Sequence, residues 1–347
     1  MKAKIFTTFI ACAFSLAALQ AQVFIIERGS STLTFTTIKA AVDALQDNDK
    51  LFIPPGTHSL KGYNWTGYDD TENHSNKLVV NKKVAIFGAG YSDGANSTIL
   101  KDGEFMIGKD ASGSSISGIR FDLNFVLDNI SNCIVSRCRM NYYFYLSGLG
   151  NNIVITECDI VNTIYSTSSS YKNLGGNGLV ATVSKCIFRN YPRVNTVNIY
   201  NSVFHSPYFD NCTNTNISNS IILVSETVTN SAATYLGVSN VFSNNLWVGG
   251  YPSPVSSNDC TLANNIEREA FANVFVDKNN NDFHLKPGCK GIGAGSDGTD
   301  VGLYGTTMPF KDSKLPSIPY FKTKVISPET NAAGKLPVHI QVEAQDN

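Results

Sequence analysis

Charged side chains are scarce in this chain of 347 residues. It has 27 Lys and Arg against 28 Asp and Glu, which is 16% of the sequence and a formal net charge of −1. Because proteins bind nucleic acid largely by neutralising phosphates with clustered Lys and Arg, this composition lacks the signature of a nucleic-acid partner. The histidines form no His-x-x-x-His pair and the cysteines no Cys-x-x-Cys pair, so we expect no zinc site.

Long apolar runs are also missing, apart from one at the amino terminus. Residues 1–4 carry two lysines, an apolar run from Ile5 to Leu19 follows, and Ala21-Gln22 comes next, which is the order of a secretory signal peptide. Cys12 would allow a lipoprotein attachment site, but the apolar run continues past it. We therefore expect residues 1–21 to be removed and the protein to be secreted or held at the cell surface. No later stretch is long enough to span a membrane.

The middle of the chain repeats one short pattern seven times. Each repeat has an anchor residue, an apolar residue two positions before it and another three positions after it. The anchors are Gly118, Arg137, Glu157, Lys185, Asn201, Asn219 and Asn244. The residues two before are Ile116, Val135, Ile155, Val183, Ile199, Ile217 and Phe242, and those three after are Phe121, Met140, Ile160, Phe188, Phe204, Ile222 and Trp247. Constant core positions separated by variable spacings are typical of a solenoid.

This spacing predicts two short strands on either side of a tight bend. Gly or Asn at the bend tolerates a left-handed backbone, and a unit of roughly 20 residues is the size of one coil of a parallel β-helix. Stacked coils at ~4.8 Å would bury a continuous core. Asn201, Asn219 and Asn244 would then lie above one another as an Asn ladder. The sequence therefore predicts an all-β solenoid.

A column of small side chains follows the anchors directly: Cys138, Cys158, Cys186, Ser202 and Ser220. In adjacent coils, Cα atoms ~4.8 Å apart fall within disulfide range, so Cys138 could bridge Cys158, or Cys158 could bridge Cys186. The alternative is stacked buried thiols that act as small apolar groups. We favour the thiols.

The residues after the expected signal resemble a known family. Thr36–Gln46 has an apolar stripe at helical spacing, Lys50–His58 reads KLFIPPGTH, and residues 77–91 read KLVVNKKVAIFGAGY. This order is similar to the amino-terminal cap and first coils of the pectate-lyase-like right-handed β-helix superfamily. The resemblance implies a single-stranded right-handed parallel β-helix with a capping helix. That superfamily includes polysaccharide lyases, glycoside hydrolases and adhesins without catalysis. Ile86, Gly88 and Tyr91 fit the repeat pattern and predict one more coil.

The carboxy-terminal third changes character. Residues 279–305 resemble the closing segment of secreted bacterial β-helix proteins. Asp297 and Asp300 would allow a calcium site, although their spacing is not that of an EF-hand loop and hydrogen-bonded turns are the favoured interpretation. Beyond Pro309, two alternating runs predict a β-hairpin. We therefore expect a signal peptide at 1–21, a right-handed parallel β-helix at 22–305, and a linker with a hairpin at 306–347.

A charged strip is predicted on three or four neighbouring coils. Residues two after each anchor should point away from the core, so the strip combines such residues with charged anchors and their neighbours. It contains Arg120, Arg137, Arg139, Glu157, Asp159 and Lys185. Arg189 and Arg193 lie just beyond it, and Tyr142, Tyr143 and Tyr145 lie next to it.

This strip has two interpretations. In a lyase acting on an acidic (uronate) glycan, Arg139 or Lys185 would be the catalytic base, Asp159 and the other arginines would bind substrate, and the tyrosines would stack on sugars. Alternatively, Arg137 with Glu157 and Arg139 with Asp159 are ordinary cross-strand ion pairs. We favour the second interpretation, because no complete catalytic set is present. The sequence then predicts a monomeric protein that binds a polysaccharide or cell-surface glycan or mediates adhesion, with a lyase as the alternative.

Overall fold

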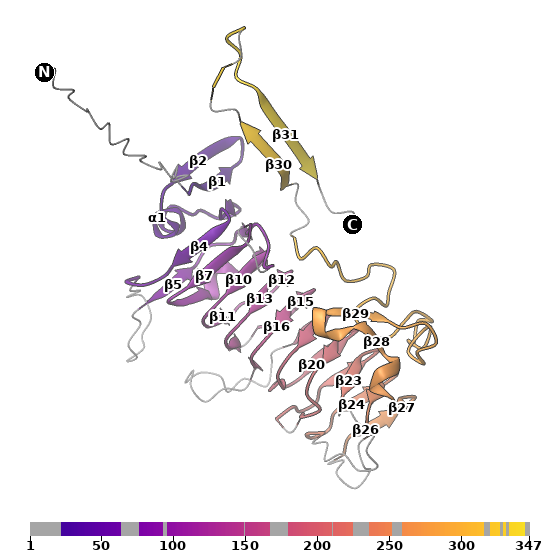
Figure 1. The fold of residues 1–347 in the computed structure, drawn as a ribbon. Coiled ribbons are helices and arrows are strands. Elements are labelled where there is room, and N and C mark those ends of the chain that lie inside the picture. Colours follow the sequence, from indigo (N-terminus) through magenta and orange to yellow (C-terminus); the bar gives the residue numbers. More distant parts are fainter. Residues whose placement is uncertain are drawn as a thin grey trace, which may run out of the picture.

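The computed structural model describes residues 22–63, 76–92, 96–148, 150–166, 180–209, 211–224, 236–251, 259–315, 320–326, 329–330 and 333–343. The expected signal peptide lies outside these residues. The described chain is mostly β, with long sheets of stacked parallel strands running the length of the molecule (Figure 1). No helix among the described residues has the length and apolar character required to cross a membrane.

Three sheets form the faces of the solenoid. Sheet A has twelve strands in the order β2 (Ser31–Phe35), β1 (Phe24–Arg28), β3 (Lys50–Phe52), β6 (Ala85–Phe87), β9 (Ser115–Ser117), β12 (Ile134–Ser136), β15 (Ile153–Thr156), β18 (Ala181–Ser184), β20 (Val197–Tyr200), β22 (Asn216–Ser218), β24 (Val241–Ser243) and β26 (Thr261–Ala263). Strand β1 pairs antiparallel with β2 and β3, and the other pairs are parallel.

Sheets B and C complete each coil. Sheet B has ten strands in the order β27 (Ile266–Glu269), β25 (Leu246–Val248), β23 (Ile221–Leu223), β21 (Val203–Phe204), β19 (Ile187–Phe188), β16 (Asp159–Ile160), β13 (Arg139–Met140), β10 (Ile119–Phe121), β7 (Thr98–Lys101) and β4 (Gly56–Ser59). Sheet C has five strands in the order β17 (Ile164–Tyr165), β14 (Phe144–Ser147), β11 (Phe125–Asp128), β8 (Glu104–Ile107) and β5 (Lys77–Val80). A short helix, α1 (Ile38–Asp43), begins after Thr37, whose hydroxyl accepts from the Ala40 amide, and packs against β1 and β2.

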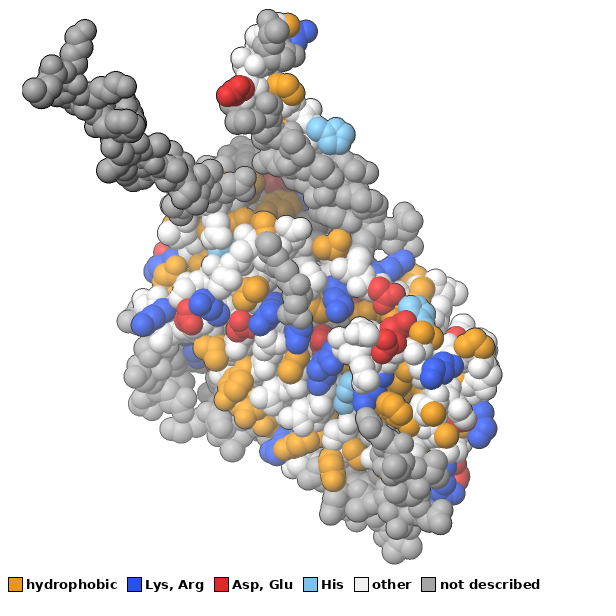
Figure 2. All heavy atoms as spheres, viewed as in Figure 1, with side chains coloured by type: hydrophobic (Ala, Val, Ile, Leu, Met, Phe, Trp, Pro, Cys, Tyr) orange, Lys and Arg blue, Asp and Glu red, His pale blue; other side chains and the backbone are white. Residues whose placement is uncertain are grey.

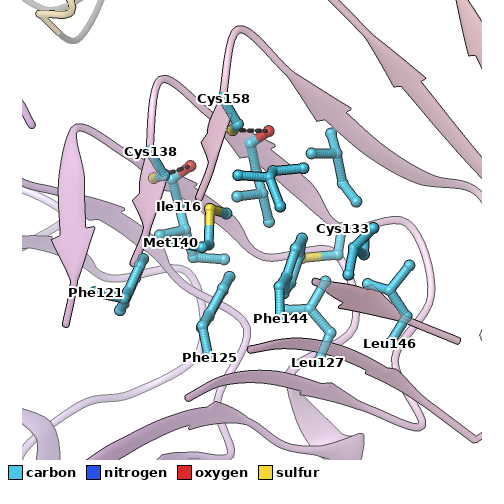
Figure 3. Packing of buried hydrophobic residues seen from close by; sticks show 14 of the residues in the cluster. Ile116, Phe121, Phe125, Leu127, Cys133, Cys138, Met140, Phe144, Leu146 and Cys158 are labelled. Carbon is cyan, nitrogen blue, oxygen red and sulfur yellow. Dashed lines mark hydrogen bonds between the residues drawn. The ribbon is translucent and has the colours of Figure 1, made fainter. Parts of the chain in front are cut away.

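The predicted core columns are confirmed by the strand register. Val183 pairs with Ile199, and Ile199 pairs with Ile217, so these side chains form one continuous file inside sheet A. On sheet B the residues three after the anchors are likewise consecutive partners from Phe121 to Trp247. Both columns are at most 1% exposed. Figure 3 shows part of this interior.

The bends at the anchors have the predicted left-handed backbone. Gly118 has a φ of 73°, and the six other anchors have φ between 48° and 55°. The additional coil predicted from Ile86 and Gly88 is present, because Ile86 pairs with Ile116. The position predicted for Tyr91 was wrong, because β7 begins only at Thr98 and the residue opposite Phe121 is Leu100. Thr98 lies ten positions after Gly88, whereas β13 begins two positions after Arg137, so Tyr91 precedes the strand and lies outside the core column.

The small side chains after the anchors form an internal ladder. Cys138, Cys158 and Cys186 are free and fully buried, and each thiol donates to the carbonyl two residues before it at 3.2 to 3.3 Å. Ser202 and Ser220 repeat this bond, and their hydroxyls also accept from the backbone N–H of the preceding coil at 3.1 and 3.0 Å. Burial raises the pKa of the Cys138 thiol to about 12, so these groups act as packing and hydrogen-bonding residues.

Residues 270–315, here called the C-terminal segment, cover part of the outer face of sheet B. The segment contains η3 (Phe271–Asn273), β28 (Phe275–Asp277), η4 (Lys278–Asn280) and β29 (Asp282–Leu285). It forms a second apolar core with side chains that point out of the solenoid: Ile187, Val203, Ile221 and Leu246 pack with Val274, Phe275, Phe283, Val301, Leu303 and Phe310. Beyond it, β30 (Tyr320–Ile326) and β31 (Val338–Glu343) pair antiparallel and stand off the solenoid in Figure 1.

Candidate functional site

The structure places the predicted site residues on two separate surfaces. Arg120, Arg139 and Asp159 are consecutive partners on β10, β13 and β16, as the repeat register predicts. Tyr142, Tyr143 and Tyr145 belong to the next face, around sheet C. Figure 2 shows Lys and Arg side chains alternating with Asp and Glu in a row across the solenoid. The two surfaces have different surroundings.

Asp159 is the centre of the charged residues on sheet B. It is only 2% exposed, and Arg189 approaches its two oxygens with Nε at 2.7 Å and Nη2 at 3.0 Å. Arg139 Nε lies 3.8 Å from Asp159 Oδ2 and donates to Asn141 Oδ1 at 2.9 Å. The Arg189 guanidinium also donates to Asn281 of the C-terminal segment at 2.9 Å. This carboxylate therefore neutralises two arginines, one of which holds the segment.

The charged anchors form a second group along the bend. Glu157 accepts from Arg137 Nε at 2.8 Å and lies 3.6 Å from Lys185 Nζ. Lys185 Nζ also donates to the Met308 carbonyl at 2.8 Å, and Arg137 Nη1 donates to the Leu315 carbonyl at 3.3 Å. These protons are engaged by the C-terminal segment, so the geometry supports fastening of that segment rather than proton abstraction by Lys185.

The asparagine anchors continue the same line of contacts. The Asn219 side-chain amide donates to the Ser296 hydroxyl and accepts from the Ser296 backbone N–H, both at 2.9 Å. The Asn219 backbone carbonyl accepts from the Gly302 backbone N–H at 2.8 Å. The C-terminal segment therefore runs back along the bends, from Asn219 through Lys185 to Arg137. The positions that define the repeat in the sequence also hold this segment in place.

His205 lies beneath the C-terminal segment and gives it a pH dependence. Its ring packs edge-on against Phe283 with centroids 5.5 Å apart. Burial lowers the pKa of His205 to about 4, and Arg189 and Lys278 lower it further, while Asp159 opposes them. The pKa of His205 is lower in the folded protein than in the unfolded chain. The contribution of the neutral ring to the free energy of unfolding is therefore fully present above about pH 6.5 and is lost as the pH falls towards 4.

We expect this group to remove about 2 to 3 kcal/mol of unfolding free energy between pH 7 and pH 4. Replacing His205 by phenylalanine should remove that part of the pH dependence, because the ring is retained without the titrating nitrogen. Urea unfolding of the wild type and the His205→Phe variant at several pH values measures the difference. An identical pH dependence of the two proteins would contradict the prediction.

The outer face of sheet C carries an aromatic surface. Met106, Val126, Tyr145 and Tyr165 are consecutive strand partners. Arg193, in the next coil, forms an isolated parallel β-bridge with Tyr165 through the backbone. Met106, Val126 and Tyr145 form an apolar cluster separate from the solenoid core. This column lies eight residues after each anchor from Val126 to Arg193.

Five tyrosines and one arginine make up what we call the tyrosine surface: Tyr142, Tyr143, Tyr145, Tyr165, Tyr191 and Arg193. Tyr143 is 5.2 Å from Tyr165 and 4.4 Å from Tyr142, measured between ring centroids. Tyr145 stacks on Tyr165 at 5.3 Å and 18°. The Arg193 guanidinium lies 5.5 Å from the Tyr165 ring and 5.1 Å from the Tyr191 ring, and donates to the Tyr191 hydroxyl at 3.0 Å.

The tyrosine surface is fixed but accessible. Tyr142 is 41% exposed, Tyr145 is 7% exposed, and Tyr143, Tyr165 and Tyr191 are half-buried. Burial raises the pKa of Tyr145 well above its usual range, and the neighbouring tyrosines add to this. Tyr145 therefore stays neutral, and the rings of this surface present apolar faces together with hydroxyl groups that can form hydrogen bonds.

The sequence prediction included four members of this surface and missed two. Tyr142, Tyr143, Tyr145 and Arg193 were singled out as neighbours of the charged strip. Tyr165 and Tyr191 were missed. The signal for Tyr165 was present, since it follows Glu157 by eight residues as Tyr145 follows Arg137.

The two aspartates considered as calcium ligands, Asp297 and Asp300, form hydrogen bonds within the C-terminal segment. Asp297 Oδ1 accepts from the Thr299 amide and hydroxyl, and Asp300 Oδ1 accepts from the Gly293 amide, so both carboxylates close turns. Among the residues that the structure describes, no three His, Cys, Asp or Glu side chains gather to hold a metal ion. No protein-family model matches the chain, and no curated protein matches it.

Proposed function

We propose that this chain is an exported right-handed parallel β-helix of the pectate-lyase-like kind that binds polysaccharide, at the cell surface or after secretion. In this proposal α1 caps the first coil, and β30 with β31 forms a carboxy-terminal hairpin. The tyrosine surface is the observation that carries the function. Tyrosine rings present an apolar face to the CH groups of a pyranose and a hydroxyl to its rim.

Arg193 supports an acidic glycan as the ligand. Its guanidinium lies close to both Tyr165 and Tyr191, where a sugar bound beside these rings would bring a carboxylate within reach. Guanidinium and carboxylate form strong charge-assisted hydrogen bonds. The preference for an acidic sugar would therefore come from this residue, and Arg193→Gln should weaken binding of uronate polymers more than of neutral ones.

The lyase alternative requires Arg139 or Lys185 to act as a base on the same glycan. Both are engaged in ion pairs, Arg139 with Asp159 and Lys185 with Glu157, on a different face from the tyrosines. This arrangement favours binding without cleavage. Ultraviolet absorbance of an unsaturated product, lost in Lys185→Ala or Arg139→Ala, would instead support the lyase.

The test is a triple substitution of Tyr142, Tyr143 and Tyr165 by alanine. At about 1 kcal/mol for each stacking ring, the variant should bind roughly 100-fold more weakly to the uronate polysaccharides that the wild type retains. Affinity electrophoresis in gels containing each polymer measures this, and circular dichroism checks the fold. Tyr208→Ala is the matched control, because Tyr208 is 43% exposed and lies outside the tyrosine surface. Equal retention of the triple variant and the wild type would contradict the proposal.

A further inference from the structure

The outer face of sheet A carries no charged side chain over most of its length. Nine successive strands, from β6 to β26, contain no Asp, Glu, Lys, Arg or His. The chain has 55 charged residues elsewhere, 27 basic and 28 acidic. Exposed protein surfaces ordinarily carry about 25 to 35% charged residues, so this face differs from the rest of the molecule.

The side chains of this face lie in two straight rows. Inward residues such as Val135, Ile155 and Val183 alternate with outward ones. The first outward row is Ala85, Ser115, Ile134, Val154, Thr182, Asn198, Asn216, Val241 and Thr261. The second is Phe87, Ser117, Ser136, Thr156, Ser184, Tyr200, Ser218, Ser243 and Ala263. Successive members of a row are ~4.8 Å apart.

The two rows combine polar groups with apolar ones in a fixed arrangement. Hydroxyls and amides are interspersed with exposed apolar side chains, of which Ile134 is 46% exposed, Val241 38% and Tyr200 36%. The Ser184 hydroxyl donates to the Thr156 hydroxyl at 3.1 Å. β-branched side chains are also stiff at χ1. The face is therefore preorganised, which lowers the entropic cost of binding.

The size of this face argues against a second copy of the chain as its partner. Nine strands give a strip about 40 Å long and about 10 Å wide. That is roughly 400 Å² for each partner, about half of what a stable protein interface buries. A narrow strip of this length suits a linear polymer that lies along the solenoid axis.

We propose that the outer face of sheet A is a second binding surface, for a neutral linear polysaccharide. A charged polymer would find no counter-charge on it. A neutral glycan presents repeated hydroxyls, which the Ser, Thr and Asn side chains can bond, and CH faces, which Ile134, Val241 and Tyr200 can contact. The two surfaces use different sheets, so this inference does not rest on the tyrosine surface. Together they would let one molecule hold two polysaccharides.

The test places one ion pair in the middle of the face. Asn198 and Asn216 are exposed direct partners, so Asn198→Lys with Asn216→Glu keeps the net charge and adds a favourable cross-strand pair. The probes are microcrystalline cellulose and chitin, with bound protein measured after sedimentation. We expect the wild type to bind at least one polymer and the double variant to bind at least tenfold less. A loss of binding would then reflect the charged face and not unfolding.

Two controls separate this surface from the rest of the protein. Thr307→Glu with Ser313→Lys introduces the same charges at exposed positions of the C-terminal segment and should bind as the wild type does. The Tyr142, Tyr143 and Tyr165 triple variant should also keep its cellulose or chitin binding.

Several results would overturn the inference. They are a wild type that binds neither polymer, and a double variant that binds as well as the wild type. Light scattering that shows a wild-type dimer lost in the double variant would assign the face to self-association. Inhibition of ice growth that is lost in the double variant, without polymer binding, would assign it to ice.

Discussion

Replacing Phe204 by alanine is expected to lower the free energy of unfolding by about 3 to 5 kcal/mol, the range for a large aromatic removed from a packed core. Phe204 is fully buried. Its ring stacks on Phe188 with centroids 4.6 Å apart and meets Phe209 edge-on at 5.2 Å. The neighbouring coils are held by their strand pairing and cannot close the space, so a cavity would remain. Guanidinium unfolding followed by circular dichroism measures the loss.

Tyr208→Ala provides the control for this substitution. Tyr208 is four residues away and 43% exposed, and an exposed substitution of this kind usually changes stability by less than about 0.5 kcal/mol. If Phe204→Ala lowered the free energy of unfolding by less than about 1 kcal/mol, the packing of Phe204 against Phe188 and Phe209 would not be as described.

Replacing Asp159 by asparagine is expected to cost about 2 to 3 kcal/mol and to loosen the C-terminal segment. The substitution keeps the shape of the side chain but leaves Arg139 and Arg189 without their carboxylate. Breaking a fully buried pair costs about 3 to 5 kcal/mol, and we expect less here because the two arginines are 22% and 24% exposed. Since Arg189 also holds Asn281, faster limited proteolysis after residue 270 should accompany the loss of stability.

Asp122→Asn is the matched control for the Asp159 substitution. Asp122 accepts from Arg120 and Asn141, but its side chain is 27% exposed, and exposed ion pairs contribute about 0.2 to 1 kcal/mol. If Asp159→Asn left stability and proteolysis unchanged while abolishing turnover of a uronate glycan, the charged strip would be catalytic rather than structural.

The C-terminal segment decides which faces of the solenoid are available. It covers the apolar outward column of sheet B from Ile187 to Leu246 and engages the charged anchors. The tyrosine surface on sheet C and the uncharged rows of sheet A do not belong to this second core. Tyr142 on the tyrosine surface and Ile134, Tyr200 and Val241 on sheet A remain exposed beside the segment. The side chains of Arg137, Lys185 and Arg189 fasten the segment.

The sequence already indicated that part of the outer face of sheet B is covered. Residues two after the anchors were expected to point outward, and they do, but four of them are apolar: Ile187, Val203, Ile221 and Leu246. An outward apolar column signals a covering element. The sequence did not identify the covering element, because Val301 and Leu303 lie between 55 and 116 positions further along the chain than the residues of this column.

The interior of the solenoid was determined by the sequence alone. Apolar residues at fixed offsets from an anchor, together with a residue that accepts a left-handed backbone, specify each coil, and strand pairing at ~4.8 Å then forces equivalent positions into register. That is why the file through Val183, Ile199 and Ile217, and the buried thiol column, were predictable. The position of Tyr91 was not, because the longer connection from Gly88 to Thr98 is invisible to a pattern read over six residues.

The use of the outer surface was decided only by the tertiary structure. The charges of Arg137, Glu157 and Lys185 look equally suited to a ligand or to a structural contact until the carbonyls of Met308 and Leu315 are placed beside them. The tyrosines came together because each coil returns its chain to the same face after about 20 residues. The local sequence pattern determines which side chains lie in the core of each coil. Contacts between segments that are distant in the sequence determine which side chains remain exposed on the surface, and ligand binding depends on these exposed side chains.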